Sequence, residues 1–163
     1  MLFLLFQLGT DRYALETSRI VEVLPLVHWK TIPQAPPGVA GVFDYHGSPV
    51  PLIDLGELAL GRPSRALMST RIIVVKYVAA AVESQAIEEA GETPLLGLLA
   101  EQATLTLRRS EADFSDPGVA IDTVPYLGPV ITDAQGIIQR VEVEHLLPAN
   151  VRDLLFRHSL EPV

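Results

Sequence analysis

Three polar residues that could form a catalytic or metal site lie close together in the sequence: Asp44, His46 and Asp54. Asp44 and His46 are two positions apart, so on a β-strand their side chains would point to the same face. A carboxylate beside an imidazole can transfer protons or hold a metal ion, which would suit a metal-dependent hydrolase. The competing interpretation is a polar turn, in which Gly47 adopts a positive φ and Asp44 hydrogen-bonds its own backbone.

The rest of the sequence contains no other recognisable catalytic pattern. The chain has no cysteine, which excludes a disulfide framework, a thiolate metal site and a cysteine nucleophile. Its four histidines follow no metal-ligand spacing, and its glycines form no phosphate loop, dinucleotide fingerprint or nucleophile elbow. We therefore expect no catalytic residues, no cofactor and no metal, and we keep the hydrolase as an alternative.

Composition limits the class of protein and of partner. The chain has 163 residues, of which 48% are hydrophobic and 20% charged, as in ordinary globular domains. Its net charge of −8 argues against nucleic acid, whose phosphates require a basic face. No apolar run reaches the ~20 residues of a membrane helix. The apolar start lacks a basic flank and a cleavage pattern, so it predicts a buried strand. We expect a cytoplasmic protein without direct membrane insertion.

The elements that must position these residues are short strands. The patterns predict strands over 2–8, 13–16, 18–24, 39–43, 48–53 and 71–78, two more within 95–107, and a final pair over 118–127 and 136–143. Helical patterns are few: 54–60 and a tail beyond 146. The Ala- and Glu-rich stretch 79–91 suits either a helix or a solvated excursion. Without βαβ alternation, the chain is predicted to be mainly β, either a sandwich or barrels.

Local signals describe the surroundings of the polar residues. Asp54 is expected to cap the short helix, with Glu57 completing a capping box. Pro49 and Pro51 alternate along one strand and remove donors from one side of its backbone. We expect that strand at a sheet edge, or against something other than a backbone partner. Edge strands with aliphatic residues are where small β-domains bind other proteins, which favours a binding module. The alternative is that these prolines only block edge aggregation.

Several stretches, taken in order, point to a known family. They are Phe6-Gln-Leu-Gly-Thr-Asp-Arg-Tyr-Ala-Leu, Ile20-Val-Glu-Val, Ile32-Pro-Gln-Ala-Pro-Pro-Gly-Val-Ala-Gly-Val, Gly47-Ser-Pro-Val-Pro-Leu-Ile-Asp-Leu, Leu96-Gly-Leu-Leu-Ala-Glu and Gly136-Ile-Ile-Gln-Arg-Val-Glu-Val-Glu-His-Leu-Leu. Over about residues 3–148 the chain resembles the CheW-like coupling proteins of bacterial chemosensory systems. The most specific part of this resemblance is the block 33–55.

The resemblance implies a fold and a function. The fold would be two small five-stranded β-barrels, similar to SH3 or OB barrels, packed on a shared hydrophobic core with short helices and a C-terminal helix. Within a single CheW-like domain (1–163), the first barrel would cover 15–78, the second 1–14 plus 79–148, and a helical tail 149–163. The function would be a non-catalytic adaptor that couples the cytoplasmic tip of a chemoreceptor to the regulatory domain of a CheA-type histidine kinase, recruited to membrane-bound receptor arrays.

The resemblance also implies roles for individual residues. Receptor-binding positions are expected at Ile20, Glu22, Val23, Gly41 and His46, and turn or structural positions at Asp44, Gly47, Pro51 and Asp54. The family turn usually reads Asn-x-Arg-Gly, with an arginine that is important for coupling. Here a histidine, shorter and mostly neutral near pH 7, replaces that permanent charge.

Two further departures from the family are the pair Ala100-Glu101, where a Val-Asp pair is usual, and the longer segment 79–92. Both favour a dedicated pathway outside motility, such as a surface-sensing or second-messenger system. A β-barrel module for a peptide or polysaccharide, unrelated to chemosensing, is the remaining alternative.

Overall fold

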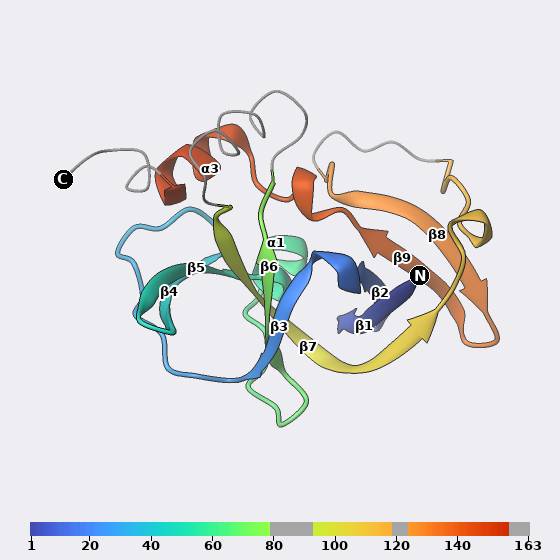
Figure 1. Cartoon of the computed structure of the whole chain (residues 1–163), viewed down its shortest axis with the longest axis horizontal. Helices are drawn as coiled ribbons and strands as arrows, with labels where there is room; N and C mark the ends of the chain where they lie inside the picture. The colour runs from blue at the N-terminus through green and yellow to red at the C-terminus, as the bar shows by residue number, and fades with distance from the viewer. Residues whose placement is uncertain (79–92, 119–123, 157–163) are drawn as a thin grey trace.

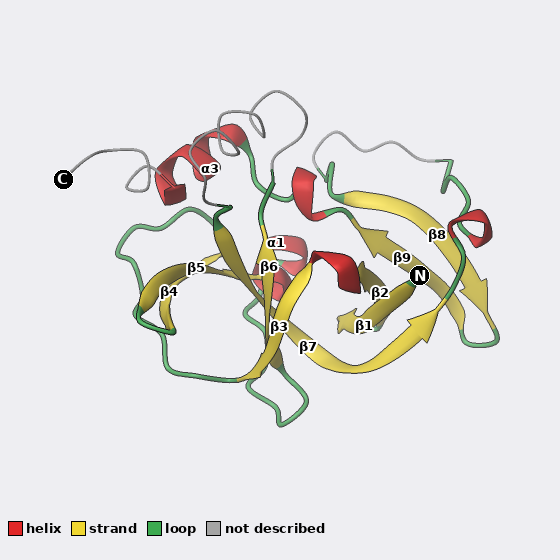
Figure 2. Cartoon of the chain, in the orientation of Figure 1, coloured by secondary structure: helices red, strands yellow, loops and turns green. Residues whose placement is uncertain are grey.

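The computed structural model describes residues 1–78, 93–118 and 124–156, and strands dominate them (Figure 1; Figure 2). The strands are β1 (Leu2–Leu8), β2 (Asp11–Glu16), β3 (Ile20–Pro25), β4 (Val39–Tyr45), β5 (Ser48–Asp54), β6 (Arg71–Lys76), β7 (Leu95–Arg108), β8 (Leu127–Asp133) and β9 (Gly136–Val141). The helices are α1 (Leu55–Leu60) and α3 (Ala149–Phe156), with short 3-10 turns at Thr17–Arg19, Glu111–Asp113 and Val143–His145. The prediction of a mainly β protein with a C-terminal helix is confirmed.

Strand β7 belongs to both halves of the structure. Its first half pairs with β6 in antiparallel and with β5 in parallel orientation, and its second half pairs with β1. Between the halves, Gln102 has a φ of 51°, and the register against β1 shifts between Leu5 and Gln7. A β-bulge of this kind bends a strand without ending it. One sheet therefore contains β3, β4, β5 and β6, the other contains β1, β2, β8 and β9, and β7 completes both.

Neither sheet closes into a barrel, which corrects the expectation from the resemblance. The hydrogen-bonded path runs β3-β6-β7-β1-β2-β9-β8, with β5 and then β4 branching from β7. Among the described residues, two isolated bridges lie outside these ladders. Lys30 pairs with Val42 of β4, and Ser115 pairs with Val130 of β8. Two five-stranded β units are present, but each is a curled, open sheet.

The two units share one hydrophobic core, as expected. The largest buried cluster joins Phe6 of β1 and Leu15 of β2 with Ile73 and Val75 of β6. Alternate residues of β6 point the other way, into a second cluster beneath β4 and β5. This two-sided burial explains why β6 consists of an unbroken apolar run instead of alternating residue types.

Three predicted elements differ from the structure. The two strands expected within 95–107 are the single strand β7, because the bulge at Gln102 does not break it. The sequence predicts a strand over 118–127, but β8 begins only at Leu127. Residues 119–123 lie outside the described part of the chain, and the described residues 124–126 form no strand. The strand predicted from Ser18 begins at Ile20, after a 3-10 turn.

The expectations for 79–91, and for the tail after 156, also fall outside the described residues. No helix in the described ranges is long and apolar enough to span a bilayer.

The shared role of β7 predicts different costs for one substitution at two positions. Leu98 is fully buried in the common core, whereas Leu105 on the same strand is 66% exposed. We expect Leu98→Ala to lower the free energy of unfolding by about 2–5 kcal/mol, because it leaves a cavity. Leu105→Ala should change it by less than about 0.5 kcal/mol. Urea unfolding of both variants measures this, and equal losses would contradict the shared core.

Candidate docking surface

The hairpin between β4 and β5 is closed by a two-residue turn. His46 and Gly47 have φ values of 51° and 87°, the left-handed conformation that tight hairpin turns require. The backbone N–H of Gly47 donates to Asp44 Oδ1 at 2.8 Å. The segment is therefore the polar turn that the sequence offers as the alternative to a catalytic site. The turn leaves the His46 side chain 75% exposed.

This turn contacts β3, which lies at the other end of the first sheet. The hydroxyl of Tyr45 donates to Glu22 Oε1 at 2.8 Å, and His46 Nε2 lies 3.6 Å from the same oxygen. The Tyr45 and His46 rings meet edge to face, 4.4 Å apart. The hydrogen bond to Glu22 raises the pKa of Tyr45 above its usual value. Side chains thus connect β3 with the β4–β5 hairpin, although no backbone ladder pairs β3 with β4.

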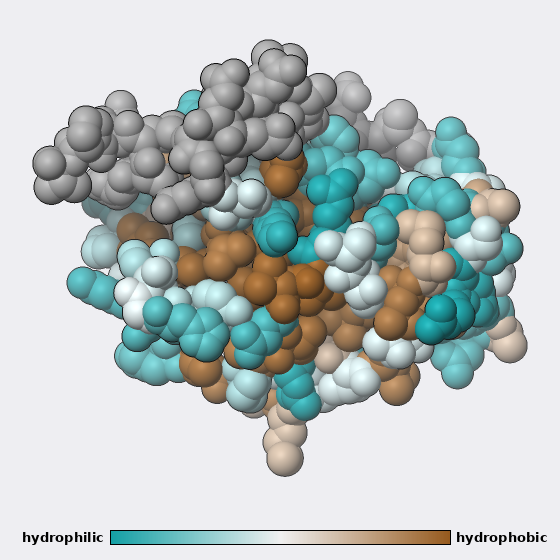
Figure 3. Space-filling model, in the orientation of Figure 1, coloured by the Kyte–Doolittle hydropathy of each residue, from teal (hydrophilic) through white to brown (hydrophobic). Residues whose placement is uncertain are grey.

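Exposed valines flank this contact. Val21 and Val23, on either side of Glu22, are 42% and 39% exposed. A register shift between β3 and β6 falls at Val21, and it interrupts the usual alternation of buried and exposed residues. Figure 3 shows hydrophobic residues gathered over β3 and its neighbours in the middle of this view. Glu22 lies opposite Val74 and Val23 opposite Ile73 of β6, so the Glu22 and Val23 side chains leave opposite faces of the sheet along its exposed edge. We call the exposed edge formed by Val21, Glu22, Val23, Tyr45 and His46 the β3-hairpin face.

Two of the expected receptor-binding residues are less exposed than the residues of this face. Ile20 is half-buried and packs against the shared core. Gly41 is buried, with a φ of 154°, and a Cβ there would collide with the carbonyl of Lys30. Glycine at this position permits the backbone bridge between Lys30 and Val42. Sequence reasoning assigns no role to Tyr45, whose contact with Glu22 joins residues distant in the chain.

The prolines of β5 lie where one side of the strand has no ladder partner. Pro49 and Pro51 pair with Asp44 and Val42 of β4. Parallel pairing with β7 begins only at Leu52, so the Ser48–Pro51 half of β5 is an edge and the remainder is not. The missing donors of the two prolines therefore fall on the half that would otherwise be open to another strand.

Asp54 lies at the far end of β5 from Asp44 and His46. Its carboxylate is buried and accepts hydrogen bonds from the N–H groups of Gly56 and Ser64 at 3.0 and 2.9 Å. It serves as the N-cap of α1, while its own N–H donates to Gly38 instead of completing the expected capping box. Because β5 spans seven residues, strand geometry separates its two ends by about 20 Å. The trio required for a hydrolase therefore does not assemble.

One other group within the described ranges has metal-ligand spacing: Glu142, Glu144 and His145. Glu144 is engaged by Arg19 at 3.7 Å, and His145 lies 3.8 Å from Glu142. Glu144 thus forms an ion pair with Arg19, and His145 forms one with Glu142 only when it is protonated.

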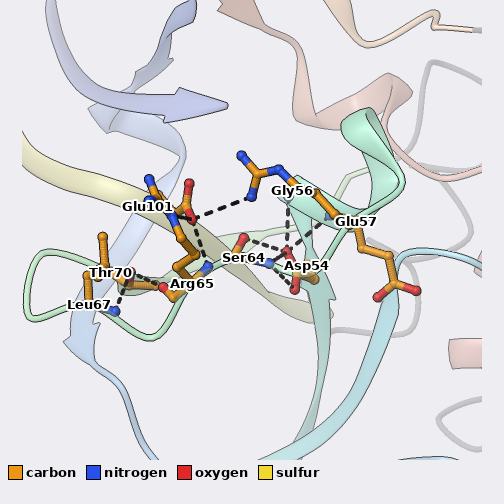
Figure 4. A network of polar contacts seen from close by, with 9 residues as sticks. Asp54, Gly56, Glu57, Ser64, Arg65, Leu67, Thr70 and Glu101 are labelled. Carbon is orange, nitrogen blue, oxygen red and sulfur yellow. Dashed lines mark hydrogen bonds and ion pairs between the residues drawn. The ribbon is translucent and has the colours of Figure 1, made fainter. Parts of the chain in front are cut away.

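A buried polar network fixes the loop between α1 and β6 (Figure 4). Glu101, 3% exposed, accepts hydrogen bonds from the N–H of Arg65 at 2.7 Å and from its Nε at 3.1 Å. Burial raises the pKa of Glu101, but the hydrogen bonds from Arg65 and the charge of Arg62 outweigh it, so the pKa lies below its ordinary value. Thr70 donates to the Arg65 carbonyl and continues the network. The sequence signal is a single acidic residue ending the apolar run Leu95–Ala100.

The lowered pKa of Glu101 predicts how stability depends on pH. A carboxyl group with a depressed folded pKa stabilises the protein above its ordinary value of 4.5, and this stabilisation is lost as pH falls through the folded value. Glu101→Gln should lower the free energy of unfolding by about 1–3 kcal/mol at neutral pH. The difference from wild type should shrink below pH 4.5. Denaturant unfolding across this range measures it, with Asp153→Asn, at an exposed position of α3, as the control. A constant difference at all pH values would show that the charge of Glu101 is not responsible.

Comparison with known proteins agrees with this geometry. A family model described as "CheW-like domain" matches residues 2–151. The crystal structure of the scaffolding protein TtCheW from Thermoanaerobacter tengcongensis matches with a TM-score of 0.74 and 18% identity, covering 92% of this chain and 89% of that one. At this level of identity the match demonstrates a shared fold. No curated protein sequence matches the chain.

Proposed function

The chain belongs to the CheW-like family, and on that premise we propose that it couples the cytoplasmic tip of a chemoreceptor to the regulatory domain of a CheA-type histidine kinase. Proteins of this family are non-catalytic scaffolds, and the chain is accordingly a scaffold and not an enzyme. We propose that it acts in the cytoplasm, recruited to membrane-bound receptor arrays.

The observation that supports receptor binding is the β3-hairpin face. Glu22 of β3 and His46 of the hairpin turn, which the family pattern implies for receptor binding, come from separate elements and lie 3.6 Å apart, from Glu22 Oε1 to His46 Nε2. Val23, which the pattern also implies, is exposed next to Glu22 on β3. A partner can bury the apolar area of the two valines, and the polar side chains of Glu22, Tyr45 and His46 can fix the partner's register. The strands beneath are held by the shared core, so the face is preformed.

The pathway that we propose is a dedicated one outside motility. The support is the histidine at position 46, where the family pattern has arginine, together with the buried Glu101 that follows Ala100. Affinity purification from cells growing under different conditions tests this. Recovery of only the flagellar chemotaxis kinase would refute the assignment to a separate pathway.

Reconstitution tests the proposed function as a whole. The purified protein is mixed with cytoplasmic fragments of the chemoreceptors encoded in the same genome and with their CheA-type kinase. We expect a three-component complex in size-exclusion chromatography and receptor-dependent kinase activity that requires this protein. Failure to bind any receptor fragment or kinase would reject the proposal and favour a module for an unrelated peptide or polysaccharide.

Substitution of His46 tests the role of the hairpin. His46→Ala should weaken binding to the receptor fragment while changing the free energy of unfolding by less than about 1 kcal/mol, because the side chain is mostly exposed. His46→Asn keeps a residue that tolerates the left-handed turn, and it should weaken binding similarly. Isothermal titration calorimetry and thermal unfolding measure the two effects.

The control for this experiment is Ile137→Ala on β9, which removes a 63% exposed apolar side chain from the other sheet. Receptor affinity should be unchanged in this variant. Loss of the fold in both His46 variants would mean that His46 is structural.

A further inference from the structure

Strand β8 is the outer strand of the second sheet, and β9 is its ladder partner among the described strands. The other side of β8 carries the backbone groups of Val130 and Thr132, because alternate residues of a strand direct these groups to the same side. The stretch from Leu127 to Thr132 has no charged residue, and Pro129 lies where the register against β9 shifts. This edge therefore lacks the charges that commonly keep edge strands from pairing with one another.

A short segment covers part of this edge. We call residues 110–115 the strap; it contains the 3-10 turn Glu111–Asp113, begins with a capping box and lies beside β8 (Figure 2). The N–H of Ser115 donates to the carbonyl of Val130 at 2.9 Å, and the N–H of Val130 donates to the carbonyl of Ser115 at 2.8 Å. The strap thus pairs with Val130, whereas the described residues provide no such bridge to Thr132.

Arg140 of β9 attaches the strap to the sheet. Its Cζ lies 5.4 Å from the ring centre of Phe3 on β1 and 5.6 Å from that of Phe114 in the strap. Its Nη1 donates to Glu111 of the strap at 2.6 Å, and its Nη2 donates to Glu16 of β2 at 2.9 Å. The Arg140 side chain is 15% exposed, and partial burial strengthens both kinds of contact. One side chain thus joins the strap to β1, β2 and β9.

The strap has few other attachments among the described residues. Phe114 is partly buried, and its ring centre lies 5.0 Å from that of Phe3. The remaining strap residues are exposed. A segment that buries so little surface opens at a lower free energy than the sheet beneath it. The position of the strap therefore depends on Arg140, on Phe114 and on the bridge at Ser115.

We propose that Arg140 is a positioning residue that keeps the strap over the β8 edge, and that this edge, when uncovered, binds the β8 edge of a second copy of the chain. Two copies related by a two-fold axis can pair these edges in antiparallel orientation, which satisfies Val130 and Thr132 of both. A second copy fits because an uncharged edge meets an equally uncharged edge. The surface shares no residue with the β3-hairpin face, so the inference does not depend on receptor coupling.

Hydrogen exchange at two neighbouring amides tests the role of Arg140. The N–H of Val130 bonds to the strap, whereas Ile131 pairs with Ile138 of β9, so the two amides separate release of the strap from unfolding of the sheet. In dilute Arg140→Gln, exchange at Val130 should accelerate about tenfold or more, because both ion pairs and both ring contacts are lost. Exchange at Ile131 should be unchanged.

Two further variants grade this effect. Arg140→Lys keeps the charge but lacks the planar guanidinium, so its exchange rate at Val130 should lie between those of wild type and Arg140→Gln. Glu111→Gln changes a side chain that is 64% exposed, weakens the contact from the strap alone and should accelerate exchange at Val130 by a smaller factor. This exposed substitution keeps the test valid if Arg140→Gln fails to fold.

Arg12→Gln is the matched control. Arg12 lies on the same sheet, is likewise 15% exposed and pairs with Asp133 of β8 at 2.9 Å, and none of its described contacts reaches the strap. Any acceleration in this variant should affect Val130 and Ile131 alike.

Sedimentation velocity tests pairing with a second copy. Compared with wild type and Arg12→Gln over the same concentration series, Arg140→Gln should form an additional concentration-dependent dimer. Adding Thr132→Pro to Arg140→Gln removes an N–H from the free edge and should abolish that dimer.

The two parts of the inference can fail separately. If exchange at Val130 stays unchanged, or accelerates together with Ile131, in both Arg140→Gln and Glu111→Gln, Arg140 does not position the strap. If Arg140→Gln sediments as wild type does, or if Thr132→Pro leaves its dimer intact, the β8 edge is not a site for a second copy.

Discussion

The structure depends on a single strand that belongs to two sheets. β7 is buried on both faces along its first half, between β5 and β6, and then bends at Gln102 to pair with β1. The largest core cluster collects residues from both sheets, and each sheet also has a smaller buried cluster of its own. The two β units are therefore held in a fixed relation by continuous backbone and by a common core.

The β3-hairpin face follows from the same topology. With β7 and β6 at the centre of the first sheet, β3 and β4 become its outer strands. The sheet curls until these ends approach, and a tyrosine and a glutamate join them where a barrel would have a backbone ladder. An edge strand kept exposed, with its register interrupted by a bulge, favours docking through side chains over pairing with another strand.

Much of this architecture could be predicted from the sequence, where the governing interactions are local. The apolar run of β6, the turn at Asp44–Gly47 and the cap at Asp54 each depend on neighbouring residues. The length of β7 could not be predicted in this way, because a glutamine gives no signal for the positive φ and the β-bulge found at position 102. The contact of Tyr45 with Glu22 and the network around Glu101 join distant segments, and strand periodicity carries no information about such pairs.

The central claim is that a preformed surface on β3 and the neighbouring hairpin, without any reactive group, receives a receptor. The most direct measurement is the mapping of amide chemical-shift changes in the labelled protein as a receptor cytoplasmic fragment is added. The account predicts that the largest changes occur at Val21, Val23 and His46. Changes confined to β8 and β9, with β3 unaffected, would contradict it.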